Sequence, residues 1–257
     1  MGTALVQGAI RSGAVSPADV IGCDPFAGSR EVFAKATGSK VFTEIAQIAS
    51  SSEVLLLCTK PHDALAALVA AAQAANGQAR LVISIAAGVT LAALEAAVPE
   101  NFRVVRAMPN TPALVGHGAA GYCLGSRANA GDAQSAQSLL GAVGLAVQVP
   151  ERLMDAVTGL SGSGPAYVYL VIEALADGGV RSGLPRADAI RLAAQTVFGA
   201  AAMVLETGEH PAVLKDMVTS PGGTTIAGLA ELERHGVRSA LIEAVSAATR
   251  RSAELGK

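Results

Sequence analysis

Tryptophan is absent from this chain, and aromatic residues make up only 3% of its 257 residues. Hydrophobic residues still account for 51%, so the chain can bury a sizeable core built mainly from alanine, valine and leucine. Small aliphatic side chains favour closely packed helices, or helices layered on a sheet, over an aromatic-rich β-sandwich. The length fits one large domain or two modest ones.

An excess of either charge is also lacking. The 19 Lys and Arg residues nearly balance the 21 Asp and Glu residues, and no basic run is present, so a nucleic-acid-binding protein is disfavoured. The apolar stretch 65–75 is interrupted by Gln73 and is too short to cross a bilayer. The first residues do not resemble a signal peptide. We therefore expect a cytoplasmic protein with neither a nucleic-acid nor a membrane partner.

Cysteine is scarce, and its placement excludes a clustered metal site. Cys23, Cys58 and Cys123 lie far apart, whereas metal ligands come in close pairs, so we interpret them as buried, reduced thiols. The histidines at positions 62, 117, 210 and 235 are equally scattered, and we interpret them as structural or surface groups. We expect no metal ion.

The first half of the chain alternates between two patterns. Short apolar runs predict buried strands, and stretches of about ten residues between them predict helices. This alternation is typical of an α/β fold with a doubly wound (Rossmann-like) parallel sheet. The predicted strands are 20–23, 53–59, 80–85, 102–107, 119–124 and 146–149; the predicted helices are 3–12, 29–37, 62–75, 91–98 and 130–140.

The second half contains no convincing strand after Met154. The segment 161–165 predicts a helix start, with a serine cap and Pro165 in the first turn, and that helix runs to about 180. Further helices are predicted at 186–206, 211–218, 225–234 and 239–254. We place the domain border near Pro150, with a dinucleotide-binding domain at 1–150 and a helical dimerisation and substrate domain at 151–257.

Several strand ends carry residues suited to a nucleotide, because ligands of open α/β sheets lie at the carboxyl ends of the strands. Thr59, Lys60 and Pro61 provide a cation and a helix start, and the small residues of 84–90 allow a ring or ribose to approach the backbone. Ordinary strand-to-helix turns explain both segments equally well. In 106–112, prolines restrict the loop around Asn110, although a structural turn uses the same residues.

The segment 215–225 is the most informative. Ser220, Thr224 and Thr225 offer hydroxyl groups, while Gly222 and Gly223 let backbone N–H groups converge before a helix. This arrangement suits a carboxylate or another small anion. A simple helix cap needs one serine or threonine, so the pattern favours an anion site.

Taken together, these segments resemble the pyrroline-5-carboxylate reductases. The resemblance covers essentially the whole chain in the expected order, and each fragment gains specificity from the others. The matching segments are 58–61, 84–88, 106–112, 159–167, 177–180 and 215–231.

The resemblance implies reduction of 1-pyrroline-5-carboxylate to proline with NAD(P)H, the last step of proline biosynthesis, by a homodimer or a ring of dimers. It implies that 220–225 holds the substrate carboxylate and that Thr225 acts as the catalytic hydroxyl near the ring nitrogen. Thr59, Lys60, Pro61, Ala86 and Ala87 are implied to line the cofactor, and we add Asn110. A protonated imine is already an electrophile, so hydride transfer requires mainly orientation and exclusion of water.

One departure concerns the first residues. Chains of this family start with a strand and a G-x-G-x-x turn, whereas this sequence resembles them only from the first helix onward, beginning at Met1. Either the sequence given lacks a natural start, or it is the whole molecule. In the second case we expect weak cofactor binding and a disturbed first domain.

Cofactor choice depends on 24–30. Asp24 suits the ribose hydroxyls of NAD, whereas Ser29 and Arg30 suit the 2′-phosphate of NADP, which the resemblance favours. A helix-entry turn explains Asp24 and Pro25 equally well.

Two alternatives remain open at this point. A related imine or 3-hydroxyacid dehydrogenase shares the layout, but those 3-hydroxyacid enzymes carry a catalytic lysine on the long interdomain helix, and 164–180 has none. A non-catalytic nucleotide-sensing protein would account for the missing glycine-rich turn, but it has no need of the anion site at 220–225. The helix at 187–205 is apolar on more than one face, which predicts burial against a second subunit.

Overall fold

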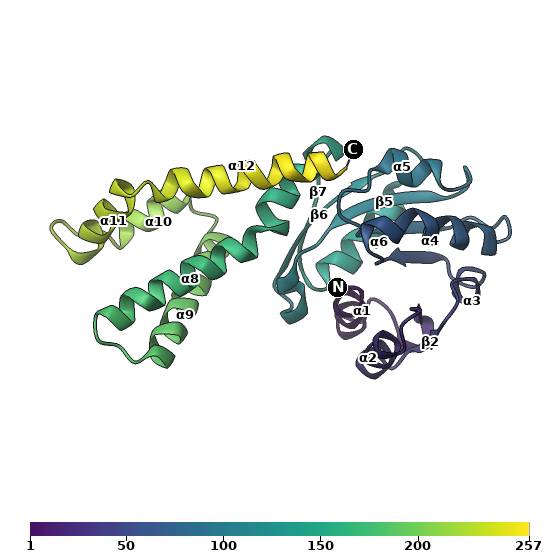
Figure 1. Cartoon of the computed structure of the whole chain (residues 1–257), viewed down its shortest axis with the longest axis horizontal. Helices are drawn as coiled ribbons and strands as arrows, with labels where there is room; N and C mark the ends of the chain where they lie inside the picture. The colour runs from purple at the N-terminus through teal and green to yellow at the C-terminus, as the bar shows by residue number, and fades with distance from the viewer. Residues whose placement is uncertain (257) are drawn as a thin grey trace. The chain divides into compact units, whose positions relative to one another are not determined.

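The computed structural model describes residues 1–256, which form two compact units (Figure 1). The first unit contains Met1–Ser163 and the residues from Ser246 onward, and the second contains Gly164–Val245. The last helix therefore begins in the second unit and ends in the first. The predicted domain border near residue 150 remains a prediction.

The strands of the first unit form two separate sheets. β1 (Ile21–Cys23) pairs only with β2 (Lys40–Phe42), in parallel. The larger sheet has the order β3-β4-β5-β6-β7. β3, β4 and β5 run parallel to one another, β6 is antiparallel to β5, and β7 is parallel to β6. The strands of this sheet are β3 (Val54–Leu57), β4 (Leu81–Ser84), β5 (Arg103–Met108), β6 (Gly118–Leu124) and β7 (Gly144–Gln148).

Among residues 1–256, no strand joins β1 to β3, so each of these strands has one unpaired edge. In the usual doubly wound order, a central strand lies at this position.

Helices cover both faces of the larger sheet. The local sequence explains where two of these helices start. Pro61 occupies the first turn of α4, and the Thr90 side chain caps α5 by accepting a hydrogen bond from the Ala93 N–H at 3.2 Å. The helices of this unit are α1 (Gly2–Arg11), α2 (Ala27–Thr37), α3 (Ala46–Ala49), α4 (Pro61–Ala74), α5 (Leu91–Ala96), α6 (Ala130–Gly141) and α7 (Met154–Val157).

The core lies on the two faces of the larger sheet because alternate strand residues point to opposite sides. On one face, Val82 and Val104 pack with residues of α3, α4 and α5. On the other face, Ile83 and Val105 pack with Leu5 of α1 and residues of α6. Burial on both faces explains the continuous apolar runs that made these strands predictable.

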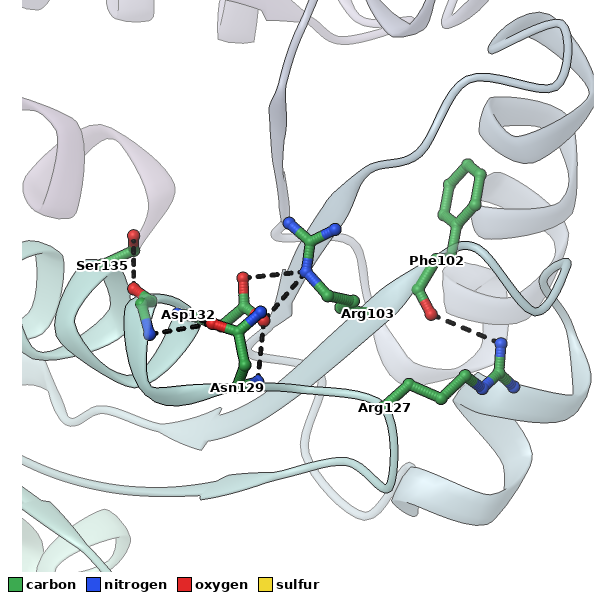
Figure 2. Close-up of polar contacts among 7 residues, drawn as sticks. Phe102, Arg103, Arg127, Asn129, Asp132 and Ser135 are labelled. Carbon is green, nitrogen blue, oxygen red and sulfur yellow. Dashed lines mark hydrogen bonds and ion pairs between the residues drawn. The ribbon is translucent and has the colours of Figure 1, made fainter.

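A polar network at the N-terminal end of β5 holds the start of α6 to that strand (Figure 2). The Asn129 side chain and Asp132 form a capping box. The Arg103 Nε donates to both carboxylate oxygens of Asp132, at 3.0 and 2.9 Å, and Arg127 donates to the Phe102 carbonyl at 3.3 Å. Asp132 is only 4% exposed, and the guanidinium of Arg103 compensates its buried negative charge.

The structure corrects three expectations. β2 and α3 were not predicted. The predicted helix does start in 161–165, at Gly164, but an unpredicted π-helical turn, Thr158–Gly162, precedes it, and in that turn the Ser161 hydroxyl donates to the Val157 carbonyl at 3.0 Å. All three cysteines are free, but of these residues only Cys123 is buried, while Cys23 is partly buried and Cys58 is exposed.

The second unit is helical and has a very small core. Its fully buried apolar cluster consists of Ala176, Ala189 and Ala193, while Leu170 and Leu205 are 67% and 75% exposed. The α9 helix is also long and apolar enough to cross a membrane by length and composition alone. The helices are α8 (Gly164–Arg181), α9 (Arg186–Thr207), α10 (Pro211–Met217), α11 (Thr224–Arg234) and α12 (Val237–Leu255).

Candidate active site

The predicted cofactor residues follow neighbouring parallel strands of the larger sheet. Leu57 of β3 pairs with Ser84 of β4, which in turn pairs with Arg106 of β5, so the three strands end at one edge. The loops at that edge carry the residues predicted to bind the cofactor: Thr59, Lys60 and Pro61 after β3, Ala86 and Ala87 after β4, and Asn110 after β5. This edge is where open α/β sheets bind their ligands.

Thr59 has the property expected of a ligand-binding group. Its Oγ1 is a buried side-chain atom without a hydrogen-bond partner, and it is the sole such atom found in residues 1–256. Unpaired buried hydroxyls are rare because they lose their hydration without compensation. A polar group of a bound nucleotide would satisfy it. The neighbouring small residues, with Ala86 buried and Gly88 at φ +78°, leave the backbone approachable. The loops therefore fit a dinucleotide.

Asn110 is already used within the protein. Its Oδ1 accepts from the Ala119 N–H at 2.9 Å, and its Nδ2 donates to the Ser161 carbonyl at 3.0 Å. The side chain thus ties the loop after β5 to β6 and to the π-helical turn. One N–H of the amide remains for a ligand, so direct contact with the cofactor remains a prediction.

An ion pair that sequence reasoning missed supports the loop after β4. The Arg106 Nη1 lies 3.1 Å from the Glu151 Oε1, which also accepts from the Leu91 N–H at 2.6 Å. Glu151 therefore links β5 to the start of α5. Burial, followed by the charge of Glu151, raises the pKa of the nearby Cys123 thiol to about 11, so this thiol stays protonated near neutral pH.

The C-terminal end of α12 forms a second support that the sequence did not reveal. The Ser252 hydroxyl donates to the Asp155 Oδ1 at 2.7 Å. A side chain at Gly256 would meet the Gly88 carbonyl, because its Cβ would lie 2.9 Å from that oxygen. These glycines pack backbone to backbone beside a cavity of about 460 Å³ lined by Pro61, His62, Leu65, Ala87, Gly88, Val89, Thr90, Ala93, Leu255 and Gly256.

The predicted anion loop lies in the second unit, directly before α11. Gly223 is the N-cap of this helix and provides no side-chain cap, so the first N–H groups of α11 are not capped by a side chain. Gly222 adopts φ +68°, a conformation that glycine accepts readily. Within residues 1–256, the hydroxyls of Ser220, Thr224 and Thr225 make no hydrogen bond. Free N–H groups, the positive end of the helix dipole and free hydroxyls together can bind a carboxylate.

Models of known protein families match residues in both units. The family model described as "Pyrroline-5-carboxylate reductase dimerisation" matches residues 151–255. A second family model, "NADP oxidoreductase coenzyme F420-dependent", matches residues 1–88. These matches agree with the predicted Rossmann-like domain followed by a helical domain, and that fold class is confirmed.

Relatives resemble the whole chain. The pyrroline-5-carboxylate reductase of Methanosarcina acetivorans is 49% identical over 257 residues, covering 100% of this chain and 95% of that protein. The Arabidopsis thaliana pyrroline-5-carboxylate reductase is 44% identical over 260 residues, covering 100% and 92%.

Solved structures agree with these relatives. A pyrroline-5-carboxylate reductase from Coxiella burnetii has a TM-score of 0.93 and 35% identity, covering 100% of this chain and 95% of that one. The Plasmodium falciparum pyrroline carboxylate reductase with NADP bound has a TM-score of 0.87 and 32% identity, with the same coverage. The sequence, the fold and the comparisons therefore agree that this chain belongs to the pyrroline-5-carboxylate reductase family.

Proposed function

We propose that the protein reduces 1-pyrroline-5-carboxylate to proline, with NADPH as its preferred hydride donor and NADH as an alternative. The observation that carries the proposal is the uncapped start of α11 beside the free hydroxyls of Ser220, Thr224 and Thr225, in a chain of this family. A small cyclic imine with a carboxylate needs such an anion site for orientation.

The cofactor side of the proposal depends on the strand-end loops. Thr59 presents its unpaired hydroxyl, Lys60 offers a cation to the phosphates, and the small side chains of Ala86 and Ala87 allow the ring to lie on the backbone. Pro61 and Asn110 hold the loops that carry these groups. Bound NADPH supplies the hydride that the imine carbon accepts.

On the substrate side, the N–H groups of Gly222 and Thr224 and the hydroxyls of Ser220 and Thr224 bind the carboxylate. The Gly223 N–H donates to the Ser220 carbonyl at 3.1 Å and so holds the turn that presents them. The Thr225 hydroxyl lies one residue into the helix, is partly buried, and is the group we assign to the ring nitrogen. The imine nitrogen arrives protonated and becomes the secondary amine of proline when the carbon takes the hydride. Thr225 therefore holds the N–H in place and need not donate a proton.

The second unit fits self-association. Its exposed apolar side chains, including Leu170 and Leu205, lie within the region matched by the dimerisation model. Large exposed apolar areas indicate an interface. We assign the apolar surface of α9 to a homodimer, alone or within a ring of dimers, and not to a membrane. We further propose that residues 1–150 bind the dinucleotide, that 151–257 dimerise and bind substrate, and that the protein acts in the cytoplasm without nucleic acid.

The experiment that tests this function compares 1-pyrroline-5-carboxylate with 1-pyrroline, which lacks the carboxylate, while NADPH oxidation and amine product are followed. We expect kcat/KM to fall by about 100-fold or more without the carboxylate, because the anion site then stays empty. Equal rates for the two imines would remove the assigned role of the loop before α11. Oxidation of a 3-hydroxyacid in place of imine reduction would favour the related dehydrogenases, although α8 carries no lysine.

A further inference from the structure

The C-terminal end of α12, residues 252–256, approaches the loop after β4 more closely than side chains would allow. A Cβ on Gly256 would lie 2.9 Å from the Gly88 carbonyl oxygen, which is closer than a Cβ can come without a shift of the backbone. Gly88 itself adopts φ +78°, and a Cβ placed on it would lie 3.6 Å from the Leu255 carbonyl oxygen. The two segments therefore pack backbone to backbone, and glycine at position 256 makes this approach possible.

A buried hydrogen bond fixes the same end of α12 to the first unit. Ser252 is 6% exposed, and its hydroxyl donates to the Asp155 Oδ1 at 2.7 Å. Asp155 belongs to α7, whose Met154 is buried in the same core cluster as Ala86. Ser252 and Gly256 are four residues apart, and the Gly256 N–H donates to the Ser252 carbonyl at 3.2 Å, so the two residues lie on one face of the helix. That face carries both the anchor and the contact with the loop.

The loop after β4 has few other restraints at its turn. Ser84 pairs within the sheet at one end of the loop, and the Thr90 side chain caps α5 at the other. Between these ends, and among residues 1–256, Ala87 and Gly88 take part in no hydrogen bond. The packing of Gly256 against Gly88 is therefore a restraint on this turn that hydrogen bonds do not duplicate.

The same turn borders the residues assigned to the cofactor. The cavity of about 460 Å³ beside Gly88 is lined by Leu255 and Gly256 together with Pro61 and Ala87, two of the assigned residues. When a binding loop is already ordered, the ligand does not lose free energy in ordering it, so a restraint of this kind raises affinity. The end of α12 can therefore influence how well the loop binds a dinucleotide.

We infer that the end of α12 is a positioning element for the cofactor: Ser252 anchors it on Asp155, and Gly256 holds the Gly88 turn in the conformation that receives the dinucleotide. The inference rests on the proposed function for the identity of the ligand, and it adds residues outside the strand-end loops to those that set its affinity. Because the role is one of positioning, loss of the contact should weaken cofactor binding and leave the hydride-transfer step largely unchanged.

Two shortened chains test the contact directly. A chain that ends at Glu254 lacks Leu255 and Gly256, whereas a control chain that ends at Gly256 lacks only Lys257. Calorimetry without imine gives the dissociation constant of NADP+ for both chains and for the unaltered protein. We expect this constant to rise about 5- to 10-fold in the chain that ends at Glu254, as for the ordering of about one further backbone residue on binding, and to stay unchanged in the control.

Hydrogen exchange without ligand shows whether the contact restrains the turn. We expect the amides of residues 86–89 to exchange faster in the chain that ends at Glu254 than in the control. Unaltered exchange would mean that other groups hold the turn, and faster exchange with an unaltered dissociation constant would mean that the contact is only structural. Either result would overturn the inference, as would the absence of NADP+ binding by the unaltered protein.

Point variants provide a second test if the shortened chain does not fold. Gly256→Ala forces the end of α12 away from the Gly88 carbonyl and should raise the dissociation constant of NADP+. Gly141→Ala should not, because its Cβ would come no closer than 3.9 Å to the Gln137 Nε2. Asp155→Ala removes the acceptor of the buried hydrogen bond, whereas Asp155→Asn keeps an acceptor oxygen and should recover the affinity. Equal constants for Gly256→Ala, Asp155→Ala and the unaltered protein would contradict the inference.

Imine reduction separates this inference from the proposed function. In the chain that ends at Glu254, the KM for NADPH should rise, while kcat at saturating NADPH and the KM for the imine stay close to those of the control. A protein whose NADP+ affinity depends on residues 255–256 but that reduces no imine would keep the role of α12 and lose the proposed function. A protein that reduces the imine with the same KM for NADPH in both shortened chains would keep the function and lose the role of α12.

Discussion

The two threonines in the first turn of α11 differ in how much solvent reaches them. Thr224 is exposed, whereas Thr225 is partly buried, and neither hydroxyl bonds to another described residue. A hydroxyl that is shielded from water interacts more strongly with a ligand. The assigned catalytic role therefore falls on Thr225, while Thr224 is assigned to the carboxylate.

Substitution of Thr225 by valine keeps the shape of the side chain and removes its hydroxyl. We expect kcat with 1-pyrroline-5-carboxylate to fall by about 10- to 100-fold, the value of one well-placed hydrogen bond to a charged group. The dissociation constant of NADPH should change little. Thr225→Ser is the matched control, because it restores the hydroxyl and should recover most of the rate; equal kcat values for the valine variant and the unaltered protein would contradict the role.

Thr59 offers a test that separates stability from binding. Its buried hydroxyl is unpaired without ligand, so Thr59→Val should raise the free energy of unfolding by about 1 kcal/mol. The same change should reduce the increase in Tm that NADPH produces, because the nucleotide loses a partner. Thermal unfolding with and without NADPH measures both effects. A variant that is less stable without NADPH would show that the hydroxyl is satisfied in solution.

At the scale of elements, long-range polar contacts position the candidate loops. Glu151 joins β5 to the start of α5, and Asn110 joins the loop after β5 to the π-helical turn. Arg106 and Glu151 are separated by 45 residues, so nothing in the local pattern announced their pairing. Their removal should loosen the loop after β4.

Substitution of Glu151 by alanine tests this support. The Arg106 side chain is only 7% exposed and would lose its carboxylate partner, so we expect a loss of about 1–3 kcal/mol in the free energy of unfolding. Solvent screening at the partly exposed Glu151 keeps the value below that of a fully buried pair. Urea unfolding gives the difference. Glu254→Ala, which breaks an exposed pair with Arg251, is the control and should change stability by less than about 0.5 kcal/mol; equal effects would contradict the account.

The elements that the sequence predicted well are strands that show a continuous apolar run and helices long enough to show the helical repeat of apolar residues. β4 and β5 are buried on both faces and were found as continuous apolar runs, as was the less buried edge strand β3. The long helices ended at glycines such as Gly38 and Gly208. β2 begins with the exposed Lys40 and is only partly buried, and α3 is a single turn, so neither shows a continuous apolar run or a helical period. The π-helical turn before α8 was not predicted, because its five residues are too few to show a period.

The candidate site was predictable to the same extent. Fold periodicity placed the strand-end loops, and the resemblance supplied their roles. The unpaired Thr59 hydroxyl and the end of α12 against Gly88 depend on the environment that forms only in the folded chain. The spacing of residues along the sequence does not predict contacts of this kind.

At the scale of the whole molecule, the second unit has too little core to account for its own stability. Its exposed apolar side chains must be covered for the unit to remain soluble. We expect the double variant Leu170→Glu and Leu205→Glu to dissociate the dimer, because each charge would be buried at the interface. Light scattering at several concentrations measures the mass. Leu114→Glu, at a residue of the first unit that is 63% exposed, should remain dimeric; a dimeric double variant would contradict the assignment.

The separation of β1–β2 from the larger sheet bears on the cofactor. The unpaired edges of β1 and β3 can each pair with a parallel strand, and a strand with a glycine-rich turn at that position would also present N–H groups to the dinucleotide phosphates. We therefore expect a version of the chain extended by such a segment before Met1 to bind NADPH more tightly than the chain as given.

The most direct measurement of the central claim is the loss of NADPH absorbance with 1-pyrroline-5-carboxylate, for the chain as given and for the extended version, each confirmed as a folded dimer. The account predicts oxidation that requires the imine, with a lower KM for NADPH in the extended version. Oxidation by neither version, with NADPH or with NADH, would contradict the assignment of this protein as a reductase of that imine.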